Sequence, residues 1–150
     1  MKDKESLFQI MNDSDAVFLS TVNGVRPRVR AMVNLRRTDL YPGAGEFCQQ
    51  EGFTVYFSTS LASGKIREIQ ANPEVSVYYC DPKKTHGLEL SGACEILSGS
   101  ELRKTLWQEE WRIYWPGGAA DPDYGILRLR PTQITGWWGS IPFTYPMSGA

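Results

Sequence analysis

The dipeptide Asn23-Gly24 constrains the fold of this chain more than any other feature of its sequence. It lies between two runs rich in β-branched residues, 16–22 and 25–35, and Asn-Gly in such a setting is the strongest short-range signal for a two-residue β-hairpin. Side chains alternate between the two faces of a strand, so Arg28 and Arg30 of the second run share one face. The sequence therefore predicts an antiparallel pair of strands near its N-terminus.

The rest of the chain consists of short runs with strand or helix periodicity, separated by turn residues. Further strands are predicted at 53–58, 75–79, 88–97, 126–130 and 133–138, helices at 6–12, 60–71 and 98–115, a loop at 37–52, and an apolar tail after 138 that docks on another surface. Most connections are too short for the crossovers that parallel strands require. We therefore predict one domain over residues 1–150, mainly β with peripheral helices, in which six or seven antiparallel strands form a barrel.

Composition limits the kinds of molecule that this chain is expected to bind. Sixteen Lys and Arg residues against 17 Asp and Glu residues give a net charge of −1, which speaks against a nucleic-acid binder, because such proteins need a basic excess. No apolar run is long enough to cross a membrane. Three cysteines and the single His86 favour neither a disulfide framework nor a zinc site. We expect a cytoplasmic protein that binds no metal, nucleic acid or membrane.

The segment 59–65, Thr-Ser-Leu-Ala-Ser-Gly-Lys, joins a predicted strand to a predicted helix. A helix N-terminus attracts anions, hydroxyls of Thr59 and Ser63 can donate to phosphate oxygens, and Lys65 adds a full charge. The segment is not a P-loop, because threonine replaces its first glycine and Ile66 stands at the magnesium-binding position. The alternative is an ordinary turn in which Ser63 caps the helix.

Two further patterns suit a flat, phosphorylated ligand. Arg28 and Arg30 could hold a phosphate by bidentate hydrogen bonds, or they could lie on a solvated strand face. Trp137 and Trp138 could stack on a planar ring, or they could serve core packing or a dimer contact. His86 is expected to be exposed in a polar turn. No pair of nucleophile and base is recognisable, so no catalytic residue is assigned.

Read together, four segments resemble the pyridoxamine 5′-phosphate oxidase-like family, and within it the general stress protein branch. They are Arg-Val-Arg-Ala-Met-Val at 28–33, Val-Tyr-Phe-Ser-Thr at 55–59, Ser-Gly-Lys-Ile-Arg-Glu-Ile at 63–69 and Asn-Pro-Glu-Val-Ser-Val at 72–77. Segments 90–95 and 130–138 agree, so the resemblance spans about residues 10–138. It implies an FMN-binding split β-barrel that acts as a homodimer, with the flavin at the subunit interface.

The resemblance also implies which residues contact the flavin. They are Arg28, Arg30, Ala31, Met32, Val33, Ser58, Thr59, Ser63, Gly64, Lys65, Trp137 and Trp138. Arg30, Ser63 and Lys65 match the phosphate-binding residues, and the backbone at 31–33 matches the strand along the isoalloxazine ring. Gly64 stands where the oxidases often carry a second basic residue, for which Arg28 could compensate. Trp138, with Trp137, matches a tryptophan that the partner subunit supplies.

One departure bears on the activity. The oxidases continue after this tryptophan with an Arg-x-His segment that holds the pyridoxal substrate, whereas residues 139–145 contain neither arginine nor histidine. The resemblance therefore implies an FMN-dependent oxidoreductase that acts on a different small molecule, with electrons from a nicotinamide. The alternatives are a flavin-binding stress or sensor protein without turnover, a relative that binds deazaflavin or haem, and a barrel that binds single-stranded nucleic acid.

Overall fold

The structure, a computed structural model, describes residues 3–81 and 83–147. Its strands are β1 (Ala16–Asn23), β2 (Arg26–Val33), β3 (Val55–Ser60), β4 (Glu74–Asp81), β5 (His86–Leu97), β6 (Tyr124–Leu129), β7 (Gln133–Trp138) and β8 (Ile141–Tyr145). Its helices are α1 (Lys4–Asp13), α2 (Pro42–Gln50), α3 (Gly64–Ala71) and α4 (Ser100–Leu106), with 3-10 turns η1 (Glu109–Ile113) and η2 (Gly118–Ala120). None of these helices is long and apolar enough to span a membrane.

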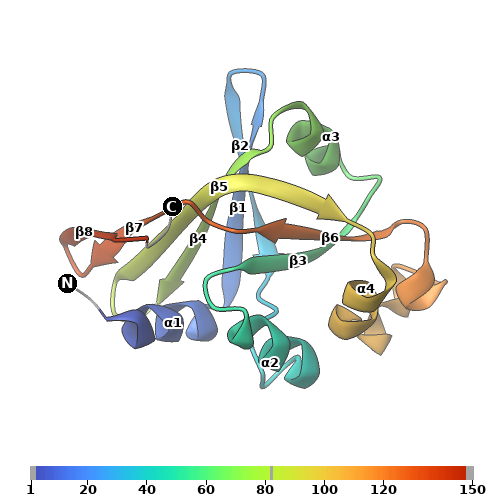
Figure 1. Ribbon diagram of the computed structural model, residues 1–150, viewed down its shortest axis with the longest axis horizontal. Helices are drawn as coiled ribbons and strands as arrows, with labels where there is room; N and C mark the ends of the chain where they lie inside the picture. The colour runs from blue at the N-terminus through green and yellow to red at the C-terminus, as the bar shows by residue number, and fades with distance from the viewer. Residues whose placement is uncertain (1–2, 82, 148–150) are drawn as a thin grey trace.

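The strands form a curled antiparallel sheet with the order β2-β1-β4-β5-β6-β3 (Figure 1). β5 is the longest strand, and one of its edges pairs with β7 through residues 86–91 and with β6 through residues 94–97. β2 and β3 end the path and do not pair with each other, so the barrel stays split. This confirms the predicted split barrel, mainly β with peripheral helices.

The β1–β2 hairpin confirms the first prediction, with a shift of one residue. Asn23 pairs with Arg26, so the two loop residues are Gly24 and Val25. Gly24 has a φ of 62°, which an L-residue adopts only at a cost, and glycine at the first loop position is typical of a type II′ turn. The tip of this hairpin projects beyond the rest of the sheet (Figure 1).

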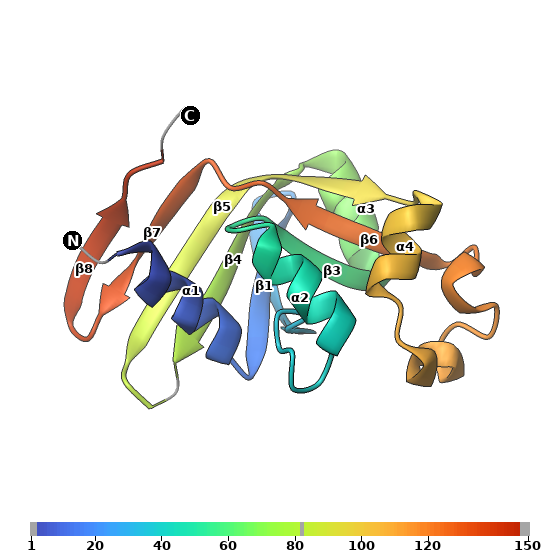
Figure 2. The same ribbon diagram turned by 60° about the horizontal axis from the view of Figure 1, so that its bottom comes forward.

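Two hydrophobic clusters hold the elements together. In the first, Leu7 and Met11 of α1 and Ile69 of α3 pack with the inward side chains of the sheet. The second joins α2, α4 and β6 around Leu106 and Tyr124. Figure 2 shows α1 and α2 lying side by side across the concave side of the sheet, whereas α3 lies beside the β1–β2 hairpin.

Three predicted elements were wrong in extent. Residues 42–50 form helix α2 rather than a loop, because Pro42 lies in its first turn, where a missing N–H costs nothing. The predicted helix at 98–115 is broken: α4 begins after Gly99 without a side-chain cap, and Trp107 is extended. The tail after Trp138 returns as the eighth strand through a turn with Gly139 at φ 64°. The described residues thus form eight strands rather than six or seven.

Candidate functional site

In β2, the usual distribution of charged and apolar side chains between the inner and outer faces of a strand is reversed. Arg30 and Met32 are half-buried on the face that Leu19 shares, whereas Val29, 69% exposed, and Val33 lie on the outer face. A surface strand normally does the opposite, with apolar side chains inward and charges in water. β2 is also an end strand, so one edge of its backbone has no strand partner among the described residues.

Arg30 is fixed by a network that the sequence did not reveal. Its guanidinium donates to Thr21 Oγ1 at 2.8 Å and to the Leu19 carbonyl at 3.3 Å, and it pairs with Glu68 Oε1 at 3.0 Å. Thr21 donates to the same carboxylate at 2.7 Å. The hydrogen bond from Thr21, followed by that from Arg30, lowers the pKa of Glu68 although burial opposes this. The network anchors α3 to the β1–β2 hairpin.

Lys65 lies beside Arg30 at the start of α3. Its Nζ donates to Thr59 Oγ1 at 3.0 Å and to Ser63 Oγ at 3.1 Å. Burial, and then the neighbouring Arg30 cation, lower the pKa of Lys65. No described carboxylate forms an ion pair with Lys65, so a half-buried cation is bound only by neutral hydroxyls. Ser63 is the N-cap residue as predicted, but its hydroxyl binds Lys65 instead of capping the helix.

Asp123 holds the turn between β3 and α3 in place. Its carboxylate accepts from Ser60 Oγ at 2.6 Å, from the Ala62 N–H at 3.0 Å and from Trp115 Nε1 at 3.1 Å. These bonds, foremost that from Ser60, keep the pKa of Asp123 below its usual range. By its position in the chain this aspartate is only a residue of the loop before β6. It instead links the turn that carries Ser63 to the tryptophans that follow α4.

The remaining predicted contacts fall into two places near this turn. Arg28 and Gly64 line one cavity of about 370 Å³ between the hairpin tip and α3, together with Arg67. Val33 and Ser58 line a smaller cavity of about 230 Å³ where β2 and β3 approach each other. Ala31 and Met32 connect the two along β2. Ten of the twelve predicted contacts therefore lie on β2, at the end of β3 and at the start of α3.

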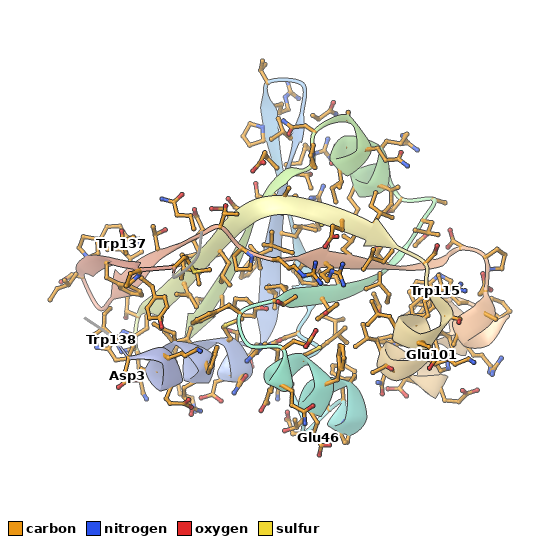
Figure 3. The ribbon with its side chains drawn as sticks, in the orientation of Figure 1. Asp3, Glu46, Glu101, Trp115, Trp137 and Trp138 are labelled. Carbon is orange, nitrogen blue, oxygen red and sulfur yellow. The ribbon has the colours of Figure 1, made fainter. Side chains whose placement is uncertain are left out.

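The two tryptophans lie elsewhere. β1, β4 and β5 separate β7 from β2, and Figure 3 shows Trp137 and Trp138 at the end of the molecule opposite Trp115. Trp137 is 49% exposed on the outer face of the sheet. Trp138 points the other way and stacks on His86, with ring centres 3.8 Å apart. His86 is therefore half-buried rather than exposed as predicted, and its Nδ1 accepts from the Gly139 N–H at 2.9 Å.

The chemistry of the assembled site is that of anion binding. Two cations, Arg30 and Lys65, lie close enough to influence each other; Arg30 is paired with the Glu68 carboxylate, and two hydroxyls converge on Lys65. Within residues 3–81 and 83–147 no group of three or more His, Cys, Asp or Glu residues is placed to hold a metal ion. Burial raises the pKa of the Cys48 and Cys94 thiols to about 12, so neither is a thiolate nucleophile at neutral pH.

The fold and this site define a split β-barrel protein with a cationic site at the start of α3. We call this site, formed by Arg30, Lys65, Thr59 and Ser63, the cationic cradle. The sequence profile of the pyridoxamine 5′-phosphate oxidase family matches residues 4–138, and the chain belongs to that family. General stress protein 26 of Bacillus subtilis (strain 168) is 25% identical over 134 residues, which are 87% of this chain and 85% of that protein.

Solved structures of other proteins share the fold, among them the following two. A protein from Clostridium acetobutylicum related to general stress protein 26 superposes with a TM-score of 0.76 at 22% identity, over 97% of each chain. An FMN binding protein of Nostoc punctiforme PCC 73102, related to pyridoxamine 5′-phosphate oxidase, superposes with a TM-score of 0.60 at 18% identity, over 88% of this chain and 81% of that one.

Proposed function

We propose that this chain binds FMN and acts as an FMN-dependent oxidoreductase on a small molecule other than pyridoxamine 5′-phosphate. The observation that carries the proposal is the half-buried Lys65, held by hydroxyls beside a second cation, Arg30. A phosphate would compensate the charge of Lys65, which has no ion pair among the described residues, and would accept hydrogen bonds from Lys65, Arg30 and the hydroxyls that converge there. The residues present therefore fit the phosphate of FMN.

Each part of the site would hold a different part of the cofactor. Arg30, Lys65 and Ser63 hold the phosphate, while the free backbone edge of β2 offers N–H and C=O groups to the polar edge of the isoalloxazine ring. Bound FMN supplies the hydride or electron transfer. The protein binds the cofactor, orients it and excludes water, which agrees with the lack of a recognisable acid–base pair in the sequence.

We also propose a homodimer, because the outer face of the β1–β2 hairpin is unusually apolar. Phe18, Val29, Ala31 and Val33 lie on this face, and register pairs Phe18 with Ala31. In the arrangement that the family resemblance implies, the second subunit would supply its Trp138, with Trp137, to the flavin. Light scattering of the FMN-loaded protein should give twice the 16.9 kDa chain mass, and Val29→Asp should shift it toward the monomer. A wild-type monomer at micromolar concentration contradicts the homodimer.

Vitamin B6 oxidation is not part of the proposal. The residues after Trp138 form β8, which carries neither arginine nor histidine. A phosphorylated substrate would lack the charge-assisted hydrogen bonds that hold it, each worth about 1.5–3 kcal/mol. The relative named as a general stress protein favours a second candidate, a flavin-binding stress protein without turnover.

One experiment tests the proposal and separates the candidates. Purified protein is titrated with FMN and followed by flavin fluorescence, and the complex is then titrated anaerobically with NADH and NADPH. Binding of FMN followed by bleaching of its visible absorption supports the oxidoreductase. Binding without reduction by either nucleotide supports the stress protein, and no binding of FMN refutes both.

A further inference from the structure

The small cavity between β2 and β3 has walls unlike those of the cationic cradle. Six residues line its volume of about 230 Å³: Val33, Leu35, Ser58, Trp111, Tyr114 and Trp115. Three of them are aromatic and none is charged. Tyr114, 68% exposed, stands at the rim, whereas Leu35 and Trp115 are buried. We call this space the aromatic pocket.

Ring packing and hydrogen bonds fix the side chains that line the aromatic pocket. Trp111 and Trp115 lie edge to face with ring centres 6.1 Å apart, and Trp115 packs on Tyr124 at 4.9 Å. The Trp115 indole N–H donates to Asp123, and Ser58 Oγ lies 3.0 Å from the Tyr124 hydroxyl. A pocket whose side chains are already fixed loses little conformational entropy when a ligand enters.

The position of the aromatic pocket connects it with the proposed cofactor site. Val33 ends the part of β2 that would lie along the isoalloxazine ring, and Ser58 belongs to the same predicted set of contacts. The inference therefore rests on the proposed function and deepens it, because a ligand in this pocket would lie beside residues that are predicted to contact the flavin ring.

We propose that the aromatic pocket binds the substrate, and that this substrate is an uncharged, planar aromatic molecule of one or two fused rings. The volume is below the roughly 300–1,000 Å³ of pockets for drug-sized ligands. Flat aromatic walls favour stacked or edge-to-face contact with a flat ring. A charged ligand would lose its hydration here without gaining an ionic partner, because no lysine, arginine, aspartate or glutamate lines the space.

The test is calorimetric titration of the FMN-loaded protein, without any reductant, with three compounds of one shape series. They are 2-naphthol, its sulfonated counterpart naphthalene-2-sulfonate, and its saturated counterpart decahydro-2-naphthol. We expect 2-naphthol to bind with one-to-one stoichiometry and each counterpart to bind about tenfold or more weakly. Equal affinity for the sulfonate, or for the saturated ring, overturns the proposal.

A pair of neighbouring substitutions locates the binding. Tyr114→Ala removes one wall and should weaken 2-naphthol about three- to tenfold, the scale of one aromatic pair. Ile113→Ala is the matched control, since Ile113 is 78% exposed in the same turn and does not line the pocket. Both variants should keep the wild-type affinity for FMN and the wild-type melting temperature. Unchanged 2-naphthol affinity in Tyr114→Ala overturns the proposal.

Two outcomes distinguish failure of this inference from failure of the proposed function. Displacement of FMN by 2-naphthol would mean that the pocket seats the flavin ring itself, which overturns the inference and leaves FMN binding intact. If the wild type binds no FMN, the proposed function fails, and the same titrations of the flavin-free protein decide whether the aromatic pocket is selective on its own.

Discussion

Replacing Lys65 by alanine is the sharpest perturbation of the cationic cradle, because Lys65 contributes little else to the fold. Among residues 3–81 and 83–147, only the hydroxyls of Thr59 and Ser63 bind its Nζ, and its charge repels that of Arg30. Arg30 is a poorer probe, since its removal would take away the ion pair of the largely buried Glu68 carboxylate and leave it only the hydrogen bond from Thr21. Lys65→Ala should therefore fold as the wild type does.

The expected effect follows from the bond that is lost. A charge-assisted hydrogen bond contributes about 1.5–3 kcal/mol, which corresponds to roughly ten- to a hundredfold in FMN affinity. Riboflavin lacks the phosphate, so it should bind the wild type much more weakly and Lys65→Ala with nearly the same affinity as the wild type. Lys104→Ala, which removes an exposed lysine of α4, is the control for a general change in charge.

The pH dependence has a definite sign. Phosphate binds the ammonium form, and the pKa of Lys65 in the free protein lies below the ordinary lysine value of 10.5. FMN affinity should therefore have its full value at neutral pH, where Lys65 is protonated. It should fall as pH rises through this lowered pKa, at a lower pH than for an exposed lysine. Fluorescence titrations at stepped pH, corrected with riboflavin, measure the fall, and Lys65→Arg should abolish it. Wild-type FMN affinity in Lys65→Ala would place the phosphate elsewhere.

Three further predictions concern single residues around the site and core. Gly64→Lys should tighten FMN but not riboflavin in fluorescence titrations, because a Cβ there meets only Arg67 Nη2, at 3.8 Å. Arg36→Met should lower the free energy of urea unfolding by about 1–3 kcal/mol, since it removes the guanidinium that donates to the buried Cys48 carbonyl and to the part-buried Gly52 carbonyl. Glu68→Gln should reduce the loss of folding free energy at acid pH. In the wild type the pKa of Glu68 is lower in the folded state than its unfolded value near 4.5, so the ionised carboxylate stabilises the fold above that pH. This contribution is lost as pH falls through the folded pKa, and glutamine does not have it. If the free energy of unfolding of Glu68→Gln falls at acid pH as steeply as that of the wild type, the network with Arg30 contributes nothing to stability.

Local signals predicted those elements whose shape depends on a few neighbouring residues. The hairpin follows from Gly24, which adopts positive φ, and α3 ends at Asn72 because proline follows it. The cationic cradle was also predictable, since Ser63 and Lys65 lie within one turn of the helix start. Such features need no knowledge of the rest of the chain.

Tertiary packing decided the features that the sequence did not predict. The tryptophan-rich segment keeps helical spacing, yet Trp107 leaves the helix, and its ring lies edge to face on Tyr124 with centres 5.2 Å apart. Asp123 is only a loop residue by its neighbours, and its role depends on Ser60 and Trp115, which meet it across the fold. Glu68 is likewise three residues from Lys65 in the chain, but its partner is Arg30 of another element.

The two faces of β2 carry different kinds of side chain, and this difference bears on the proposed function. Alternation in the sequence separates Arg30 from Val29 but cannot say which of the two faces inward, and the structure places the cation inside because Glu68 and Thr21 compensate its charge there. For an isolated subunit this arrangement is unfavourable, since valines contact water and a charge is half-buried. The same arrangement gives one strand three roles in the proposals: inward cations for a phosphate, a free edge for a flat ring, and an outward apolar face for a second subunit. Lys65→Ala changes α3 beside the inward Arg30, and Val29→Asp changes the outer face of β2, so the two substitutions act on opposite sides of this strand. Loss of flavin affinity in the first variant without loss of the dimer would show that the two roles are independent.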